Sequence, residues 1–338
     1  MNHFQQVIPN VYTVALPLPF ELESVNVHLI KLDNGWMLID CGMETDEAWQ
    51  TLEPAIASMG LQWTDIRQIL LTHMHPDHMG MSARLLELTG AVLWMHAVEA
   101  EHLEIVARGT RRVPWLDTVF SRAGVSMELQ SRMERHFLQI RRNFHDLVPN
   151  RLFQGGEEIP TAAGSFRVLW TPGHSPGHIC LYNEQAKLLI SGDQILENIT
   201  PNVAWHPDAD TLGDFLASLE KLRPLEIDII LPSHGTPFSG HREWIANTIA
   251  HHGERCDEML RLVTDAPRSA NTLVTEMWRR QLSPINHHFA IFEVLAHLEH
   301  MHRQGRVHAQ EREADGVWEW MPGQGRGVEH RTVEASRD

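Results

Sequence analysis

LLTHMHPDHMG, residues 70–80, is an apolar run followed by three histidines and an aspartate within six positions. These four side chains are too closely spaced for ordinary surface decoration: His73, His75, Asp77 and His78. Imidazole and carboxylate groups are the ligands that Zn²⁺, Fe and Mn accept in proteins. The stretch therefore predicts a metal site directly after a buried strand.

Three later stretches place a histidine or an aspartate after an apolar run in the same way. They are TPGHSPGH at 171–178, SGD at 191–193 and PSHG at 232–235. Their candidate ligands are His174, Asp193 and His234. Active sites of open α/β sheets gather beyond the carboxyl ends of the strands. We therefore expect all four stretches to meet at one edge of the fold.

The combined set has enough ligands for two divalent ions if one carboxylate bridges them. Its seven members are His73, His75, Asp77, His78, His174, Asp193 and His234. Two ions about 3.5–4 Å apart can hold a hydroxide between them near neutral pH. The pattern thus predicts a metal-dependent hydrolase that binds two ions, Zn²⁺ first, with Fe or Mn as alternatives. Asp77 and His234 are the residues that we also assign to catalysis.

Two more polar residues belong near the site without being predicted ligands. His178 ends the TPGHSPGH stretch, and we expect it to orient loops through hydrogen bonds. Asp40, in LIDCG at 38–42, is by its local pattern a turn residue.

Strand and helix patterns alternate as far as His241, which predicts an α/β fold. Strand patterns lie at 11–18, 25–32, 35–42, 66–72, 91–96, 167–173, 178–183, 187–193 and 227–235, and helix patterns at 47–60, 81–90 and 208–224. Residues 99–150 have helical periodicity and few strand signals, which indicates a helical insertion. We assign residues 1–242, with this insertion, to a catalytic domain.

The remainder of the chain predicts a second, smaller domain. Helix patterns at 243–263, 269–280 and 286–305 precede a hairpin at 306–320 that turns at Asp315-Gly316. Three helices and a hairpin are the outline of a winged-helix-like domain, which we place at 243–322. The polar end, residues 323–338, is expected to be a flexible tail.

Composition limits the partners and the compartment. The net charge of −16 disfavours bulk electrostatic capture of nucleic acid or of an anionic membrane. No uncharged apolar run approaches the roughly 18 residues of a membrane span. The chain has three cysteines, Cys41, Cys180 and Cys256, which we expect to be buried and reduced. We therefore expect a cytoplasmic protein.

The metal motifs, in their order and spacing, resemble those of the metallo-β-lactamase fold superfamily. THMHPDHMG, residues 72–80, matches the family pattern T-H-x-H-x-D-H-x-G. The resemblance implies an αββα sandwich and two metal positions, with Asp193 as the bridge. It implies that the first ion is held by His73, His75 and His174, and the second by Asp77, His78 and His234. It also implies that Asp40 supports the metal loop from behind the ligands.

Two features locate the chain within that family. TPGHSPGHICLY, residues 171–182, is similar to glyoxalase II, but QILENITPNVAWHP at 194–207 replaces the Lys-Tyr segment that holds glutathione there. The closer similarity is to the branch of β-lactamase-like protein 2, which carries a C-terminal winged-helix-like extension. Flavodiiron reductases have a glutamate at the position of His75, so reduction of oxygen or NO is not expected.

Three functions remain open. The first is hydrolysis of a small ester-type substrate: a thioester, a lactone or an activated ester. The second is a phosphodiesterase or ribonuclease, which the basic insertion favours and the acidic net charge disfavours. The third is a non-catalytic binding or regulatory module. The insertion arginines, which could form a lid over an anionic substrate, are Arg108, Arg111, Arg112, Arg132, Arg135, Arg141 and Arg142.

The helix pattern at 286–305 carries two further features. Its histidines suggest either a second metal site or, as we favour, ordinary buried and solvated imidazoles: His287, His288, His297, His300 and His302. Its apolar positions predict a face packed on the sandwich or on a second subunit, so a homodimer is an option: Phe289, Phe292, Leu295 and Leu298.

Overall fold

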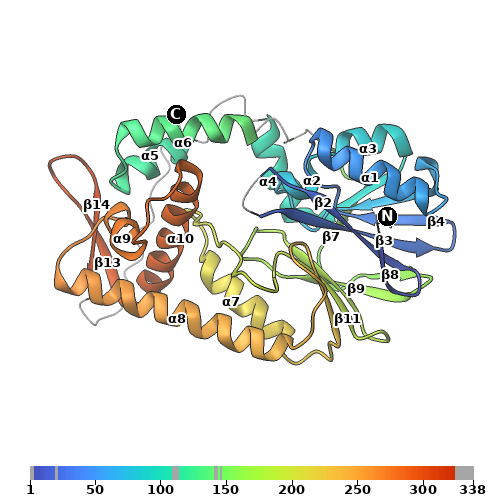
Figure 1. Cartoon of the computed structure of the whole chain (residues 1–338). Helices are drawn as coiled ribbons and strands as arrows, with labels where there is room; N and C mark the ends of the chain where they lie inside the picture. The colour runs from blue at the N-terminus through green and yellow to red at the C-terminus, as the bar shows by residue number, and fades with distance from the viewer. Residues whose placement is uncertain (1–3, 20–21, 109–113, 141–143, 145–146, 324–338) are drawn as a thin grey trace.

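Two β-sheets stack between layers of helices in this computed structural model, which describes residues 4–19, 22–108, 114–140, 144 and 147–323. Figure 1 shows the sandwich on the right and a helical region with a hairpin on the left. The predicted αββα sandwich is confirmed.

The first sheet has seven strands, and its second half is parallel. The strands pair in chain order: β1 (Gln5–Ile8), β2 (Val11–Pro17), β3 (Ser24–Leu32), β4 (Gly35–Ile39), β5 (Ile66–Leu70), β6 (Val92–His96) and β7 (Arg151–Phe153). From β4 to β7 every neighbour is parallel. Helices α1 (Asp46–Ser58) and α3 (Ser82–Thr89) cover its outer face.

The second sheet has five strands. In the order β12-β11-β10-β9-β8 they are β12 (Ile229–Pro232), β11 (Leu188–Gly192), β10 (Ile179–Asn183), β9 (Gly164–Trp170) and β8 (Glu158–Thr161). Only β11 and β12 are parallel among these pairs. Helices α7 (Thr211–Leu222) and α8 (His241–Asp265) lie on the outer face.

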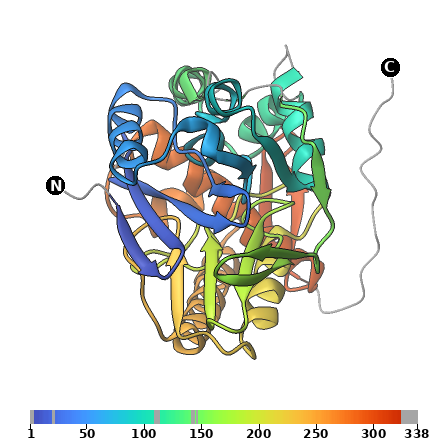
Figure 2. The same cartoon turned by 90° about the vertical axis from the view of Figure 1, so that its right-hand side faces the viewer.

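Side-chain alternation along the strands divides the core into layers. On β3, Val25, Val27 and Leu29 face α1 and α3, whereas Ile30 and Leu32 face the second sheet. The apolar cluster between the sheets includes Met37, Leu70, Phe153, Phe166, Val168 and Leu231. Figure 2 shows the blue strands of the first sheet beside the yellow-green strands of the second. Burial of this layer fixes the two sheets relative to each other.

The helical region contains the insertion and the C-terminal elements. The insertion forms α4 (Ala97–Arg108), α5 (Pro114–Arg122) and α6 (Met127–Ile140). The C-terminal elements are α8, α9 (Ala270–Met277), α10 (Pro284–Arg303) and a hairpin of β13 (Val307–Glu311) and β14 (Trp318–Pro322). The proposed domain boundary at 242 falls in the first turn of α8, and the winged-helix assignment stays a prediction. Of the expected tail at 323–338, residues 324–338 lie outside the described residues.

Helix α10 packs inside the chain. Phe292, Leu295 and Leu298 are buried in one apolar cluster with residues of α7 and α8. The ring centroids of Phe292 and Phe120, on α5, are 5.5 Å apart, so the insertion also rests on α10. Phe289 departs from the predicted face, because 45% of it is exposed.

The predicted elements are found at their predicted places, and several short elements are added, among them a 3-10 turn at Trp63–Asp65 and the helix α2 (Pro76–Met79). Gly90 ends α3 in the left-handed conformation, and the hairpin turns around Asp315 and Gly316. The short strands β1, β7 and β8 were not predicted, because they have only three or four residues each and carry little periodicity. Among the described helices, none is long and apolar enough to span a membrane.

Acid should weaken the contact between α8 and α10. His252 on α8 lies with its Nδ1 3.0 Å from Nε2 of His297 on α10. Burial lowers the pKa of His252 to about 3 and that of His297 to about 4, from 6.5. Between a pH of about 4 and 6.5, the unfolded chain therefore binds more protons at these two histidines than the folded chain does. The free energy of unfolding falls as the pH drops through this range.

Urea unfolding at neutral pH and at about pH 5 checks this expectation. The His252→Gln variant should lose about 2 kcal/mol of the pH dependence, because it removes one suppressed protonation. His302→Gln, at an exposed position of α10, is the matched control. An unaltered pH dependence in His252→Gln would contradict the assignment.

Candidate metal centre

All seven predicted ligands meet at one rim of the sandwich, beyond the carboxyl ends of four strands. The stretch after β5 carries His73 and His75 and continues into the short helix α2 (Pro76–Met79). That helix holds Asp77 and His78. The second sheet supplies His174 after β9, Asp193 after β11 and His234 after β12. The first sheet therefore contributes four of the side chains and the second sheet three.

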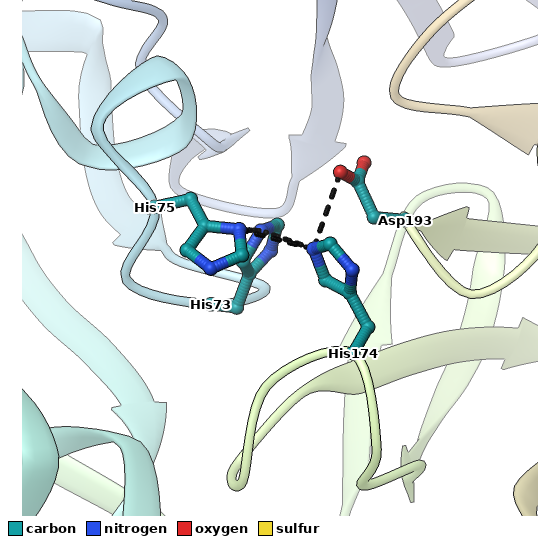
Figure 3. A group of neighbouring side chains, drawn as sticks. All are labelled: His73, His75, His174 and Asp193. Carbon is teal, nitrogen blue, oxygen red and sulfur yellow. Dashed lines mark hydrogen bonds and ion pairs between the residues drawn. The ribbon is translucent and has the colours of Figure 1, made fainter. Parts of the chain in front are cut away.

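The first group of possible ligands is His73, His75, His174 and Asp193. Figure 3 shows the three imidazoles and the carboxylate facing one another, with His73 and His75 on one loop and His174 and Asp193 on separate segments. Nδ1 of His75 lies 3.0 Å from Nε2 of His73 and 3.0 Å from Nε2 of His174. The two Nε2 atoms are 3.3 Å apart, and Oδ2 of Asp193 is 3.4 Å from Nε2 of His174.

The second group is Asp77, His78 and His234. Oδ2 of Asp77 lies 3.6 Å from Nε2 of His78 and 3.4 Å from Nε2 of His234. Asp193 faces this group too, with 3.5 Å from Oδ1 to His78 and 3.6 Å from Oδ2 to His234. Asp193 thus lies between the two groups.

Hydrogen bonds set the proton positions on four of the histidines. Nδ1 of His78, His174 and His234 faces an acceptor oxygen: the carboxylate of Asp40, the carbonyl of Asn202 and the carbonyl of Ser24, respectively. Nδ1 of His73 faces the hydroxyl of Thr72, which already donates its own proton to Asp40. Each of these four Nδ1 atoms must therefore carry the proton. In the neutral form of each ring, Nε2 therefore presents a lone pair to the rim, as a metal ligand requires.

These donor atoms fit a bound cation. The Nε2 lone pairs of His73 and His174 face each other. One proton, on Nδ1 of His75, is the most that these three atoms can share. In the second group, Nε2 of His78 and Oδ1 of Asp193 are buried and have no hydrogen-bond partner among the described residues. A metal 2.0–2.1 Å from tetrahedral ligands places those ligands roughly 3.3 Å apart. The observed separations of 3.0–3.6 Å are close to that value.

Burial and charge act differently on the two groups. Burial lowers the pKa of His73 and His75 and lowers that of His174 to about 4, so these imidazoles are neutral. In the second group burial opposes protonation, but Asp193 and Asp77 outweigh it and raise the pKa of His234 to about 10. The negative charge of these carboxylates favours a bound cation in the second group.

Asp40 and His178 lie behind the ligands, as the sequence predicted. Asp40 accepts from the backbone N–H of Thr72 and from Nδ1 of His78, at 2.8 Å each. Nδ1 of His178 bonds the hydroxyl of Thr171 at 2.8 Å, and its Nε2 accepts from the backbone N–H of Asp193 at 3.0 Å. A Cβ at Gly192, whose φ is +53°, would overlap Nε2 of His178, so glycine is required there. His178 is therefore a support of Asp193 and belongs to neither ligand group.

Three supporting residues were missed from the sequence. The amide of Asn26 donates to the carbonyls of Pro232 and Gly235, on either side of His234, at 2.9 Å each. Asn202 accepts from His174, and Glu99 contacts two of the loops. Local sequence carries little sign of Asn26 or Asn202, since their roles depend on segments far away in the chain.

Among the described side chains, the other candidate residues are not found in either ligand group. Of the insertion arginines, Arg132 and Arg135 are exposed, and the side chains of Arg108, Arg111, Arg112, Arg141 and Arg142 lie outside the described part of the structure. The histidines of α10 form separate contacts: His287 with Asn271 and His300 with Asp210. Within the described residues, they belong to no group of three possible ligands.

Comparison with known proteins gives the family. The family model described as the metallo-beta-lactamase superfamily matches residues 21–234, and the model of the metallo-beta-lactamase-like C-terminal domain matches residues 256–322. The chain belongs to the metallo-β-lactamase superfamily. It is a metal-dependent hydrolase of that superfamily, and its His and Asp cluster is consistent with the metal ions that such proteins bind.

Three relatives illustrate the similarity. A metallo-β-lactamase family protein from Thermus thermophilus has 30% identity and a TM-score of 0.82, and the match covers 94% of this chain and 100% of that one. "Probable metallo-hydrolase YqjP" of Bacillus subtilis is 26% identical over 77% of this chain and 82% of its own length. "Acyl-coenzyme A thioesterase MBLAC2" of Gallus gallus is 28% identical over 51% of this chain and 57% of its own length.

Asp40→Asn should weaken metal binding by about 10- to 100-fold at the second group. An asparagine in either orientation turns an NH₂ toward one of the donors that Asp40 now accepts from. The Nδ1–H of His78 or the loop at Thr72 would then lose its partner. Competition between the protein and a chromophoric chelator for Zn²⁺ measures the change. Asp33→Asn, in the exposed turn between β3 and β4, is the control, and equal affinities in the two variants would refute the role of Asp40.

Proposed function

We propose that this chain holds two divalent ions, most readily Zn²⁺, and hydrolyses a small ester-type substrate. His73, His75 and His174 would bind the first ion, and Asp77, His78 and His234 the second. The observation that carries the proposal is the position of Asp193, whose carboxylate lies 3.4–3.6 Å from ligand nitrogens of both groups. A single carboxylate facing two ligand sets is the arrangement that a two-ion site needs.

The exposure of the ligands indicates the side from which substrate approaches. The side chain of Asp77 is 22% exposed, against 9% for Asp193 and 4% for His234. His75 is also partly exposed, whereas His73 and His78 are buried. The bound ions would supply a water that ionises near neutral pH and a Lewis acid for the oxygen under attack. Asp77 and His234 then lie beside the reacting atoms, and the carboxylate of Asp77 is placed to accept a proton.

Several observations favour a small acyl substrate over a polymer. The net charge of −16 opposes the approach of a polyanion. One relative of this chain is named an acyl-coenzyme A thioesterase, and we extend only the class of acyl thioester from it.

A panel of acyl thioesters, lactones and activated esters tests the proposal with Zn²⁺-loaded protein. We expect turnover of at least one class, and a loss of about 10²-fold or more in His73→Ala, because both the position and the charge of the first ion are disturbed. His302→Ala, at an exposed site remote from the rim, is the control. Turnover that is equal in His73→Ala and in the unaltered chain would sink the proposal.

The alternative is a phosphodiesterase or ribonuclease, supported by the same centre and by the arginines of the insertion. If it held, binding of an oligonucleotide would weaken steeply with added salt, since phosphate contacts release counterions. We expect weak binding with little dependence on salt. Fluorescence anisotropy with a labelled single-stranded RNA, measured at low and at physiological ionic strength, distinguishes an ester hydrolase from a nuclease. Tight binding that is lost at the higher ionic strength would reverse our preference.

A purely non-catalytic module is not favoured, because all seven candidate ligands lie together at one rim.

A further inference from the structure

Glu99 is a buried carboxylate that none of the proposed roles uses. It lies in the first turn of α4, three residues after the end of β6, and only 1% of it is exposed. A buried carboxylate is costly unless its oxygens accept hydrogen bonds. The contacts of Glu99 therefore indicate what it does.

Each oxygen of Glu99 accepts a backbone hydrogen bond from a different ligand loop. Oε1 accepts from the N–H of Met74 at 2.7 Å, and Met74 lies between His73 and His75. Oε2 accepts from the N–H of Gly177 at 2.7 Å, in the loop that carries His174. Bonds between an ionised carboxylate and an N–H are short and roughly twice as strong as neutral ones.

The approach of α4 to the second loop is also close. A Cβ at residue 177 would overlap the backbone nitrogen of Glu99, so a glycine is needed there. The start of α4 therefore rests directly on the loop of His174, while the side chain of Glu99 reaches the loop of His75. The two loops come from different sheets, and Glu99 connects them.

We propose that Glu99 is a positioning residue for the first metal position. It fixes the distance between the loop of His73 and His75 and the loop of His174. This inference rests on the proposed two-ion function. It also gives the insertion a role at the centre, because the helix that begins the insertion holds both loops.

The second metal position is not tied in this way. Its ligands Asp77, His78 and His234 lie on α2 and after β12, and their supports are Asp40 and the carbonyl of Ser24. A change at Glu99 should therefore act on one position and spare the other. That selectivity separates a positioning role from a general contribution to folding.

Glu99→Gln provides the sharpest test, because it preserves size and removes one acceptor. The glutamine oxygen can serve one N–H, and its NH₂ then faces the other N–H. Metal-depleted full-length protein is titrated with Zn²⁺ in competition with a fluorescent chelator. Glu101→Gln, exposed on the same helix, is the matched control. His75→Ala and His234→Ala identify which binding step belongs to which position.

We expect Glu99→Gln to weaken one step by about 10- to 100-fold and to leave the other step unchanged. The weakened step should be the one that His75→Ala removes. Two steps equal to those of the unaltered chain, or two steps weakened alike, would overturn the role of Glu99 alone. An unaltered chain that binds no Zn²⁺ would overturn the proposed function, and this inference with it.

A second variant covers the case in which Glu99→Gln does not fold. Glu99→Asp keeps both oxygens and the charge, but it is one methylene too short to reach Met74 and Gly177 together. It should weaken the same step. Unchanged Zn²⁺ binding at both steps in Glu99→Asp would overturn the proposal.

Discussion

Four buried imidazoles whose Nδ1 protons are bonded to the protein direct their Nε2 atoms at one small volume. This constraint governs the rest of the structure. The Nε2 lone pairs of His73 and His174, 3.3 Å apart, repel unless a cation lies between them, and Nε2 of His78 and of His234 faces the carboxylates of Asp77 and Asp193. Thr72, Asp40, Asn202 and Ser24 hold the protons in place. The fold therefore has to stabilise an arrangement that is unfavourable without its metal.

The sandwich holds the ligands in place because they are divided between its two rigid sheets. The loops after β5 belong to the first sheet, and the loops after β9, β11 and β12 belong to the second. The apolar layer between the sheets sets the distance between the halves, since close-packed interiors deform little. Asn26 adds a polar connection, because it lies on β3 and bonds both sides of His234 on the opposite sheet. Loop 194–210, which carries Asn202, and α4, which carries Glu99, contact the ligand loops from the helical region.

Residues whose role depends on local pattern could be predicted from the sequence. Each ligand follows an apolar strand, so strand ends and ligand chemistry together placed His73, His174, Asp193 and His234 at one rim. The αββα sandwich came from the resemblance, and the alternation of patterns alone indicated only α/β. His178 was expected to orient loops through hydrogen bonds, and it belongs to neither ligand group.

The missing parts depend on contacts between distant segments. Asn202 and Asn26 act through backbone groups of other loops, which no local pattern records. Glu99 carried a partial signal, since it is an acidic residue just past the end of β6 at the same rim. The strands β7 and β8 are too short for alternation to appear, and pairing with β6 and β9 defines them. Phe289 follows the apolar spacing of α10, yet it lies at the end of the packed face and remains exposed.

The central proposal is that two bound cations would share the carboxylate of Asp193. Inductively coupled plasma mass spectrometry of the purified protein, before and after reconstitution with Zn²⁺, tests it most directly. The account predicts two ions per chain after reconstitution and a loss of both when Asp193 is replaced by alanine. Trace metal in the purified protein together with no uptake on reconstitution would contradict it.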